Sequence, residues 1–361
     1  MTLELQSVGK DVGPDTHLDD ISMTLENGSL NVLLGATLAG KTSLMRLMAG
    51  LDAPTRGRIL VDGRDVTGLP VQKRNVAMVY QQFINYPAMT VFENIASPLR
   101  VAGRSAAEIR AKVGEAAAIL KLEPYLDRKP LELSGGQQQR TAIARALVKG
   151  ADLVLLDEPL ANLDYKLREE LREELPRIFA QSGAVFVYAT TEPSEALLLG
   201  GATATLFQGR LTQFGPTAEV YRRPHDLVTA QVFSDPPLNL MTGARHGGMV
   251  SLSTGQVVAT SGPFAGVPDG RYELGFRAHH LGLERTSADA IPLAATVSVV
   301  EITGSESFVH MDVGGHRFVA LVPGVHRLEP GSTLTAYVEP RRLFLFDPSG
   351  RTVAADFALA A

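Results

Sequence analysis

The chain of 361 residues contains no cysteine, and this absence excludes several kinds of chemistry. Disulfide bonds, zinc sites built from thiolates and catalysis by a cysteine nucleophile are all ruled out. The sequence also lacks an apolar run long enough to span a bilayer. Residues 1–10, MTLELQSVGK, do not combine a basic stretch with an apolar one, so we expect no signal peptide. We therefore expect a soluble cytoplasmic protein, which would work at a membrane only by docking onto another protein.

An excess of basic residues is absent too. The formal net charge is -5 and the pI is about 5.9, which argues against a surface that wraps nucleic acid. Hydrophobic residues make up 45% of the chain and charged residues 20%, a composition typical of globular proteins. The sequence has no internal repeat and no low-complexity tract. Its length is sufficient for two domains of ordinary size.

The order of the segments predicts an α/β domain followed by an all-β domain. In the first two-thirds of the chain, short apolar strands alternate with helical patterns, and the stretch from about 90 to 150 is mainly helical. After FSDPPLN the chain has short alternating runs between turn signals, which predict a small β-barrel or sandwich. We place the boundary near Pro236-Pro237, so that the domains cover 1–235 and 236–361.

Residues 35–42 read GATLAGKT and fit the phosphate-loop pattern G-x-x-x-x-G-K-[ST], directly between an apolar strand and a helical pattern. Backbone N–H groups of such a loop, and of the helix that follows, form a positive concavity for phosphate oxygens. Lys41 would add a charge for the β- and γ-phosphates, and Thr42 would offer a hydroxyl to Mg²⁺. The alternative is a glycine turn with a surface lysine, which the strand–loop–helix order disfavours. The residues expected to hold a nucleotide here are Gly35, Ala36, Thr37, Leu38, Ala39, Gly40, Lys41, Thr42 and Ser43.

Two adjacent carboxylates follow a second buried strand, in the segment LVLLDEP. Asp157 suits the ligand shell of Mg²⁺, and Glu158 can accept a proton from an attacking water. The alternative interpretation is a pair of surface carboxylates that contact only solvent, which is common at the tip of a loop. At the carboxyl end of a central strand, in a chain with a phosphate loop, a functional site is favoured.

A second phosphate cradle is predicted at LSGGQQQR, residues 133–140. Ser134 is a natural N-cap, and Gly135 and Gly136 open a helix whose N-terminus phosphate could approach closely. One nucleotide needs only one such cradle. We therefore expect this one, together with Gln137, to serve a nucleotide bound to another copy or to a partner.

The combination of motifs resembles the ATP-binding subunit of an ABC transporter. LSGGQ is that family's signature, GATLAGKT its Walker A motif, LVLLDEP its Walker B motif, and residues 161–164, ANLD, its D-loop with Asp164. VYQQFINYPAMTVFENI resembles the Q-loop region, with Gln81 at the glutamine position. Together with FSDPPLN and YVEPRRLFLF, these motifs are most similar to the ATPases of maltose, glycerol-3-phosphate and polyol importers. The fold implied is an α/β P-loop ATPase domain with a helical subdomain, followed by a C-terminal barrel of the OB-like or TOBE type.

The resemblance implies a mechanism and a set of partners. Two ATPase subunits would sandwich two ATP molecules and drive two permease subunits, served indirectly by a solute-binding protein. Glu158 would direct hydrolysis, with Mg²⁺ held by Thr42, Gln81 and Asp157. The helical stretch from about 91 to 130 would receive a cytoplasmic helix of the permease; core packing is an equally good interpretation of its apolar side chains. The chain would thus lie on the cytoplasmic side of the membrane and import a sugar, polyol or glycerol-type solute. The C-terminal barrel lacks a basic and aromatic stripe, so we expect no nucleic-acid partner.

Three positions depart from the family pattern. Thr191 stands where a histidine would touch the γ-phosphate, so only a neutral hydrogen bond remains. Val12 stands where an aromatic residue would stack on adenine, and His17, although nearby, is out of register. Leu38 replaces a glycine, and its Cβ would hinder a close backbone approach or a positive φ. The signature is intact, so we expect one subunit of an asymmetric heterodimer; a homodimer with tolerated substitutions is the alternative.

Two further functions remain open from the sequence. The chain could be a regulatory partner that binds ATP but scarcely hydrolyses it. It could also be an ABC ATPase of DNA repair or translation, although it lacks the second cassette or long coiled-coil arms usual in those proteins. The histidines from His279 onward show no spacing that indicates a metal site.

Overall fold

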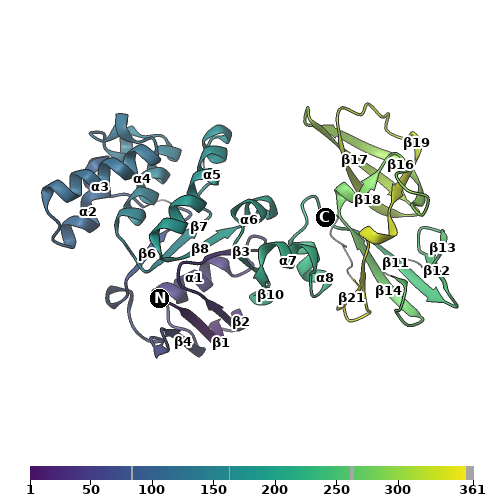
Figure 1. Ribbon diagram of the computed structural model, residues 1–361, viewed down its shortest axis with the longest axis horizontal. Helices are drawn as coiled ribbons and strands as arrows, with labels where there is room; N and C mark the ends of the chain where they lie inside the picture. Colours follow the sequence, from purple (N-terminus) through teal and green to yellow (C-terminus); the bar gives the residue numbers. More distant parts are fainter. Residues whose placement is uncertain (83, 162, 261–263, 355–361) are drawn as a thin grey trace. The chain divides into compact units, whose positions relative to one another are not determined.

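The computed structural model describes residues 1–82, 84–161, 163–260 and 264–354, apart from the side chains of residues 180 and 181. Contacts within the chain divide it into two compact units, Met1–Thr217 and Ala218–Ala361 (Figure 1). The division therefore falls before the Pro236-Pro237 pair at which the composition changes. Within the described residues, no helix is long and apolar enough to cross a membrane.

A six-stranded, mostly parallel sheet forms the centre of the first unit, in the order β10-β9-β3-β8-β7-β6. Its strands β3, β7 and β8 are almost wholly buried, because helices and a second sheet cover both faces. The register places Leu34 beside Thr190 and Asp157 beside Ala189, so the loops after β3, β8 and β7 meet at one edge. The strands are β3 (Leu30–Leu34), β6 (Val76–Val79), β7 (Leu153–Asp157), β8 (Val185–Thr190), β9 (Ala202–Phe207) and β10 (Arg210–Pro216).

A second, antiparallel sheet has the order β2-β1-β4-β5. Its strands are β1 (Leu3–Val12), β2 (Asp15–Leu25), β4 (Arg56–Val61) and β5 (Arg64–Asp65). Helix α1 (Lys41–Ala49) shares a hydrophobic core with this sheet and with one face of the central sheet. Gly50 ends α1 at φ 75°, a left-handed conformation that glycine adopts without the steric cost of a Cβ.

Residues on β8 alternate between the two faces of the central sheet, as the period of a strand requires. Val185, Val187 and Ala189 belong to the core around α1. On the other face, Phe186 stacks on Phe179 of α5 with ring centroids 4.0 Å apart. The remaining helices of the first unit are α2 (Val91–Val101), α3 (Ala106–Ile119), α4 (Gly135–Val148), α5 (Tyr165–Ser182) and α6 (Pro193–Leu199), with 3-10 turns at Val71–Lys73, Glu123–Tyr125 and Pro130–Glu132.

Helices α2, α3 and α4 pack together as a helical segment beside the sheet (Figure 1). Each begins at a capping box, in which an N-cap hydroxyl and a side chain three residues later exchange hydrogen bonds with each other's backbone. These boxes fix where the helices start; the last of them, Ser134 with Gln137, confirms the N-cap predicted for the signature helix.

The second unit consists mainly of two antiparallel sheets in a nearly closed barrel around one core, as expected for an OB-like or TOBE-type domain. One sheet has the order β13-β12-β11-β14-β20-β21 and the other β15-β19-β16-β17-β18. The strands are β11 (Asn239–His246), β12 (Met249–Leu252), β13 (Val257–Ala259), β14 (Gly270–Phe276), β15 (Leu281–Gly282), β16 (Ile291–Ile302), β17 (Glu306–Val313), β18 (His316–Pro323), β19 (Thr333–Val338), β20 (Phe344–Phe346) and β21 (Thr352–Ala354). Helices α7 (Thr217–Arg222) and α8 (Leu227–Val232) precede them, and 3-10 turns lie at Ala278–His280 and Pro340–Arg342.

Arg277 anchors this barrel to α7. Its guanidinium lies 3.6 Å from the ring centroid of Tyr221 and 4.9 Å from that of Phe344. It also donates a hydrogen bond of 2.6 Å to the Tyr221 carbonyl. The side chain is 4% exposed, and burial lowers the pKa of Arg277 to about 10. A cation held between aromatic rings in this way stabilises the packing of the barrel.

Candidate functional site

The loop between β3 and α1 forms the phosphate cradle expected from its sequence. Gly35 is required because a Cβ there would lie 2.4 Å from the Leu206 carbonyl oxygen. Gly40 has φ 104°, and Leu38 has φ 69° with 95% of its side chain exposed. We expected the Cβ of Leu38 to hinder a positive φ, yet the backbone adopts one, at a steric cost of about 1–2 kcal/mol.

Lys41 is almost completely buried at the start of α1. Its Nζ donates to the carbonyl oxygens of Gly35 and Ala36 at 2.7 and 3.1 Å. Burial lowers the pKa of Lys41, while the neighbouring carboxylates of Glu158 and Asp157 act in the opposite direction. Its ammonium group therefore lies within the cradle, held by the loop whose phosphate it is expected to bind.

Residues from separate segments complete the site around Lys41. Thr42 Oγ1 donates to Asp157 Oδ2 at 2.8 Å, and Gln81 Nε2 donates to Glu158 Oε2 at 2.9 Å. Lys41 Nζ lies 3.6 Å from Glu158 Oε1. Burial raises the pKa of Asp157, which the Thr42 hydrogen bond and the Lys41 charge counteract. The structure thus brings Thr42, Gln81, Asp157 and Glu158, four of the five residues predicted for catalysis and metal binding, together around Lys41. The fifth, Thr191, is not among these contacts.

This donor set fits Mg²⁺. A hydroxyl, a carboxylate and an amide oxygen are hard oxygen ligands, the kind that Mg²⁺ prefers. In the part of the chain that the structure describes, no group of three or more histidine, aspartate or glutamate side chains could hold a metal by itself. Mg²⁺ bound at Thr42 and Asp157 would therefore take further ligands from phosphate and water.

A cavity of about 530 Å³ opens beside these residues. Its lining includes residues of the phosphate loop, Gln81 and Glu158, together with Thr16, His17 and Gln208. From the sequence alone, we assigned His17 no role. Residues 17–19 lie against residue 209, and the Asp19 N–H donates a hydrogen bond to the Gly209 carbonyl at 2.9 Å. This proximity depends on contact between two sheets, so no local sequence pattern could predict it.

Val12 and Thr191 do not belong to the described lining of this cavity. Val12, the last residue of β1, is 48% exposed. Thr191 follows β8 and is exposed, whereas Thr190 before it is buried. Carbonyls at the end of β8 accept from both functional loops, Thr190 from the Gly35 N–H at 3.4 Å and Ala189 from the Glu158 N–H at 3.0 Å. The end of β8 is therefore joined to the site through its backbone.

The signature residues lie apart from the cavity. Ser134 caps α4, and the exposed Gly135 and then Gly136 form its first turn. Gln137 accepts from the Ser134 N–H at 3.0 Å through its side chain. A further glutamine, Gln139, donates to the Glu158 carbonyl at 3.4 Å and joins α4 to the acidic loop, a contact that we did not anticipate. Asp164 caps α5 by accepting from the Leu167 N–H at 3.0 Å, and Asn162 of the same motif is outside the described residues.

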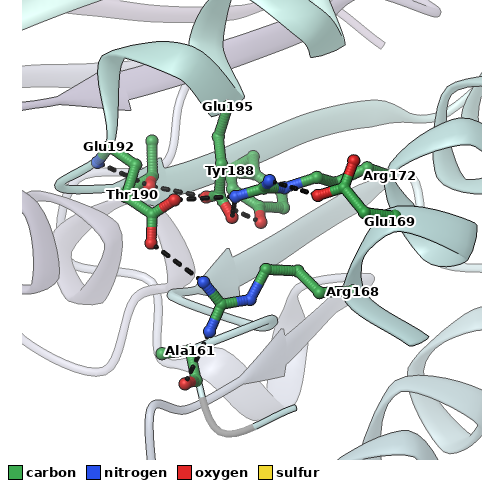
Figure 2. A network of polar contacts seen from close by, with 8 residues as sticks. All are labelled: Ala161, Arg168, Glu169, Arg172, Tyr188, Thr190, Glu192 and Glu195. Carbon is green, nitrogen blue, oxygen red and sulfur yellow. Dashed lines mark hydrogen bonds and ion pairs between the residues drawn. The ribbon is translucent and has the colours of Figure 1, made fainter. Parts of the chain in front are cut away.

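A polar network lies on the face of β8 opposite α1 (Figure 2). Buried Glu195 on α6 accepts from Thr190 Oγ1 at 2.6 Å and from the Tyr188 hydroxyl at 3.1 Å. Arg172 on α5 pairs with Glu195 at 3.0 Å and with Glu192 at 2.7 Å. Burial strongly raises the pKa of the Tyr188 hydroxyl, which keeps it a neutral donor.

Comparisons with known proteins agree with this geometry. The family model described as "ABC transporter" matches residues 18–161, and the one described as "TOBE domain" matches residues 274–346. The sn-glycerol-3-phosphate import ATP-binding protein UgpC of Yersinia enterocolitica is 36% identical over 352 residues, covering 96% of this chain and 97% of that protein. UgpC of Ruegeria sp. strain TM1040 is 36% identical over 356 residues, covering 98% and 99%.

A solved structure has the same nucleotide-binding fold. It is a dimeric, post-hydrolysis state of the ATP-binding cassette MJ0796 bound to ADP and Pi, with a TM-score of 0.55 and 27% sequence identity. The match covers 60% of this chain and 98% of that one. The phosphate loop, the acidic pair, the signature helix and the full-length relatives lead to one conclusion: the chain belongs to the importer family of ABC transporter ATP-binding subunits, and it is an ATPase.

Proposed function

We propose that this chain binds MgATP in the cavity lined by the phosphate loop and His17, and hydrolyses it to power the import of a small solute. The observation that carries the proposal is the convergence of Lys41, Thr42, Asp157, Gln81 and Glu158. The β- and γ-phosphates would lie against Lys41 and the N–H groups at the start of α1. The nucleobase would extend toward His17 and Gln208, because these residues line the same cavity.

Glu158 is placed to accept the proton of an attacking water. It is partly exposed at the cavity, and Gln81 Nε2 orients its carboxylate through a hydrogen bond of 2.9 Å. When bound, Mg²⁺ would neutralise charge on the phosphate oxygens. Lys41 would leave its contacts with its own loop carbonyls and donate to phosphate instead.

We further propose that hydrolysis requires a second ATPase subunit, different from this one. Ser134 and Gly135 are exposed and do not line the cavity of their own chain, which supports a role at the nucleotide of a partner. Leu38, Val12 and Thr191 favour a weakened cavity in this chain, and hence an asymmetric pair. A homodimer is the second candidate, since the residues that contact phosphate are all present.

The surface most suited to a permease subunit is a groove of about 390 Å³ between β6, α2 and α4. Apolar side chains such as Met78 and Ala146 line it, with Val101 91% exposed at its edge. Tyr86 belongs to the segment that follows Gln81, and the Arg145 guanidinium lies over its ring, 4.9 Å from the centroid. A permease helix docked in this groove would contact the segment that follows Gln81. Movement of the permease would thereby be coupled to the position of Gln81 in the nucleotide site.

Glycerol-3-phosphate, the solute in the names of the full-length relatives, and related sugars or polyols are the solute class that we propose. The permease and the solute-binding protein would select among them. The working position would be the cytoplasmic side of the membrane, held there by the permease subunits.

The test is to reconstitute the native complex in liposomes and measure ATP hydrolysis and solute uptake with Glu158→Gln. We expect a large loss of both activities while ATP still binds. Retention of most hydrolysis would instead support the regulatory function, in which the partner cavity performs the chemistry. Failure of the chain to co-purify with any membrane protein would contradict the transport proposal.

A further inference from the structure

One arginine links the acidic loop of the site to the segment that follows β8. Arg168 on α5 donates from Nη1 to Glu192 Oε1 and from Nη2 to the Ala161 carbonyl, both at 3.3 Å (Figure 2). Ala161 lies in the loop that starts at Glu158 and leads to α5, and its own N–H donates to the Glu158 carbonyl at 3.3 Å. Glu192 immediately follows Thr191.

The anchor of this link is rigid. Arg172 Nη2 lies 2.7 Å from Glu192 Oε2 and 3.0 Å from Glu195 Oε1, and its Nη1 lies 2.7 Å from Glu169 Oε1. The Glu192 N–H donates to Thr190 Oγ1 at 3.0 Å, which closes the turn after β8. Because Glu195 is buried, removing one partner of the Arg172 pair would leave an uncompensated charge and damage the fold.

Arg168 differs from Arg172 in what its removal would cost. Its side chain is 25% exposed, against 12% for Arg172, and of the carboxylates that Arg172 holds it contacts Glu192 and not the buried Glu195. A partly exposed pair of this kind contributes little to stability. Its two contacts join backbone segments that carry functional residues: one starts at Glu158, and the other holds Thr191.

We propose that Arg168 is a positioning residue, which makes the Glu158–Ala161 loop and the Thr191–Glu192 segment move as one body. This inference rests on the proposed function. When the second ATPase subunit closes over the nucleotide, displacement of either loop reaches the other through this guanidinium. Without it, the loop that carries Glu158 and the segment that carries Thr191 move independently, and a smaller share of closures leads to hydrolysis. A misplacement of about 1 Å at a reacting group can lower a rate by about a hundred-fold.

The experiment compares Arg168→Gln with Arg177→Gln in the complete transporter. Arg177 lies on the same helix, 73% exposed, in an ion pair of 3.3 Å with Glu174, and it provides the matched control. We expect R168Q to lower kcat about ten-fold or more, with KM, ATP affinity and thermal midpoint close to wild type. R177Q should behave as wild type, and Arg168→Lys, which keeps the charge, should recover part of kcat.

A double-mutant cycle with Glu192→Gln tests whether Arg168 acts through its contact with Glu192. If Arg168 acts through Glu192, R168Q/E192Q should lose no more kcat than E192Q alone. Unchanged kcat in R168Q, or a loss that follows ATP affinity or the folded fraction, would overturn the proposal. Should R168Q not fold, the same kcat and KM comparison on E192Q and R168K decides it. A wild-type complex without any ATPase activity would instead refute the proposed function.

Discussion

Replacing Leu38 with glycine tests the phosphate loop where its backbone is most unusual for the residue it carries. Leu38 has φ 69°, and its side chain is 95% exposed, so removing the side chain sacrifices almost no burial. A left-handed leucine costs about 1–2 kcal/mol, whereas glycine loses about 0.5–1 kcal/mol more backbone entropy on folding. The difference favours L38G by about 0.5–1 kcal/mol. For a domain of this size the melting temperature should rise by about 1–4 °C.

The effect on nucleotide binding should be larger than the effect on stability. If the Cβ of Leu38 keeps one loop N–H from the phosphate, L38G restores a hydrogen bond to a charged group, which contributes about 1.5–3 kcal/mol. The affinity for MgATP should then rise at least about ten-fold, because about 1.4 kcal/mol corresponds to each factor of ten.

Isothermal titration of MgATP into wild type, L38G and Leu38→Ala separates the causes. L38A retains the Cβ and the strained φ but removes the rest of the exposed side chain. We expect L38A to bind like wild type and L38G to bind more tightly. Equal affinities in all three proteins would refute the argument about the loop, and equal gains in both variants would assign the effect to side-chain bulk.

Further predictions concern a buried charge, the nucleobase side of the cavity and the barrel. Asp157→Asn should be more stable than wild type near neutral pH, because burial raises the pKa of Asp157 and disfavours its charged form in the folded state. The stability gap should shrink as pH falls through that raised pKa and vanish below the ordinary aspartate range; a constant gap in chemical denaturation would contradict this. His17→Ala should weaken MgATP binding by up to about ten-fold through loss of base stacking, with exposed His246→Ala as the control, and unchanged affinity would remove His17 from the nucleotide site. Arg277→Ala should destabilise the second unit by about 2–4 kcal/mol, since it removes a buried cation between two rings and a hydrogen bond to Tyr221, yet it should leave ATP affinity intact; calorimetry with ATP titration checks both.

The sequence predicted those parts of the fold and the site that depend on contiguous residues. The phosphate loop is one unbroken strand–loop–helix segment, so Lys41 and Thr42 could be assigned from their spacing. Asp157 follows a buried strand, and parallel strands end at a common edge, which brought it to Thr42. The cap at Ser134 is also a local property.

Contacts between distant segments left no comparable signal. His17 reaches the cavity because one sheet lies against the turn of another. Gln139 is one of three consecutive glutamines, and only the packing of α4 selects it for the Glu158 carbonyl. Arg168 and Arg172 resemble any charged residues of a surface helix. Their partners on α6 and in the acidic loop become evident only when β8 has placed these segments together.

The most direct test of the central claim measures ATP turnover per subunit against concentration, with and without the companion ATPase subunit. The claim is that this chain completes a hydrolytic site only when another subunit supplies a signature helix. Turnover should fall toward zero as dilution separates the subunits, and the companion should restore it at concentrations where this chain alone is inactive. Constant turnover per subunit at dilutions where the chain is monomeric would contradict the account.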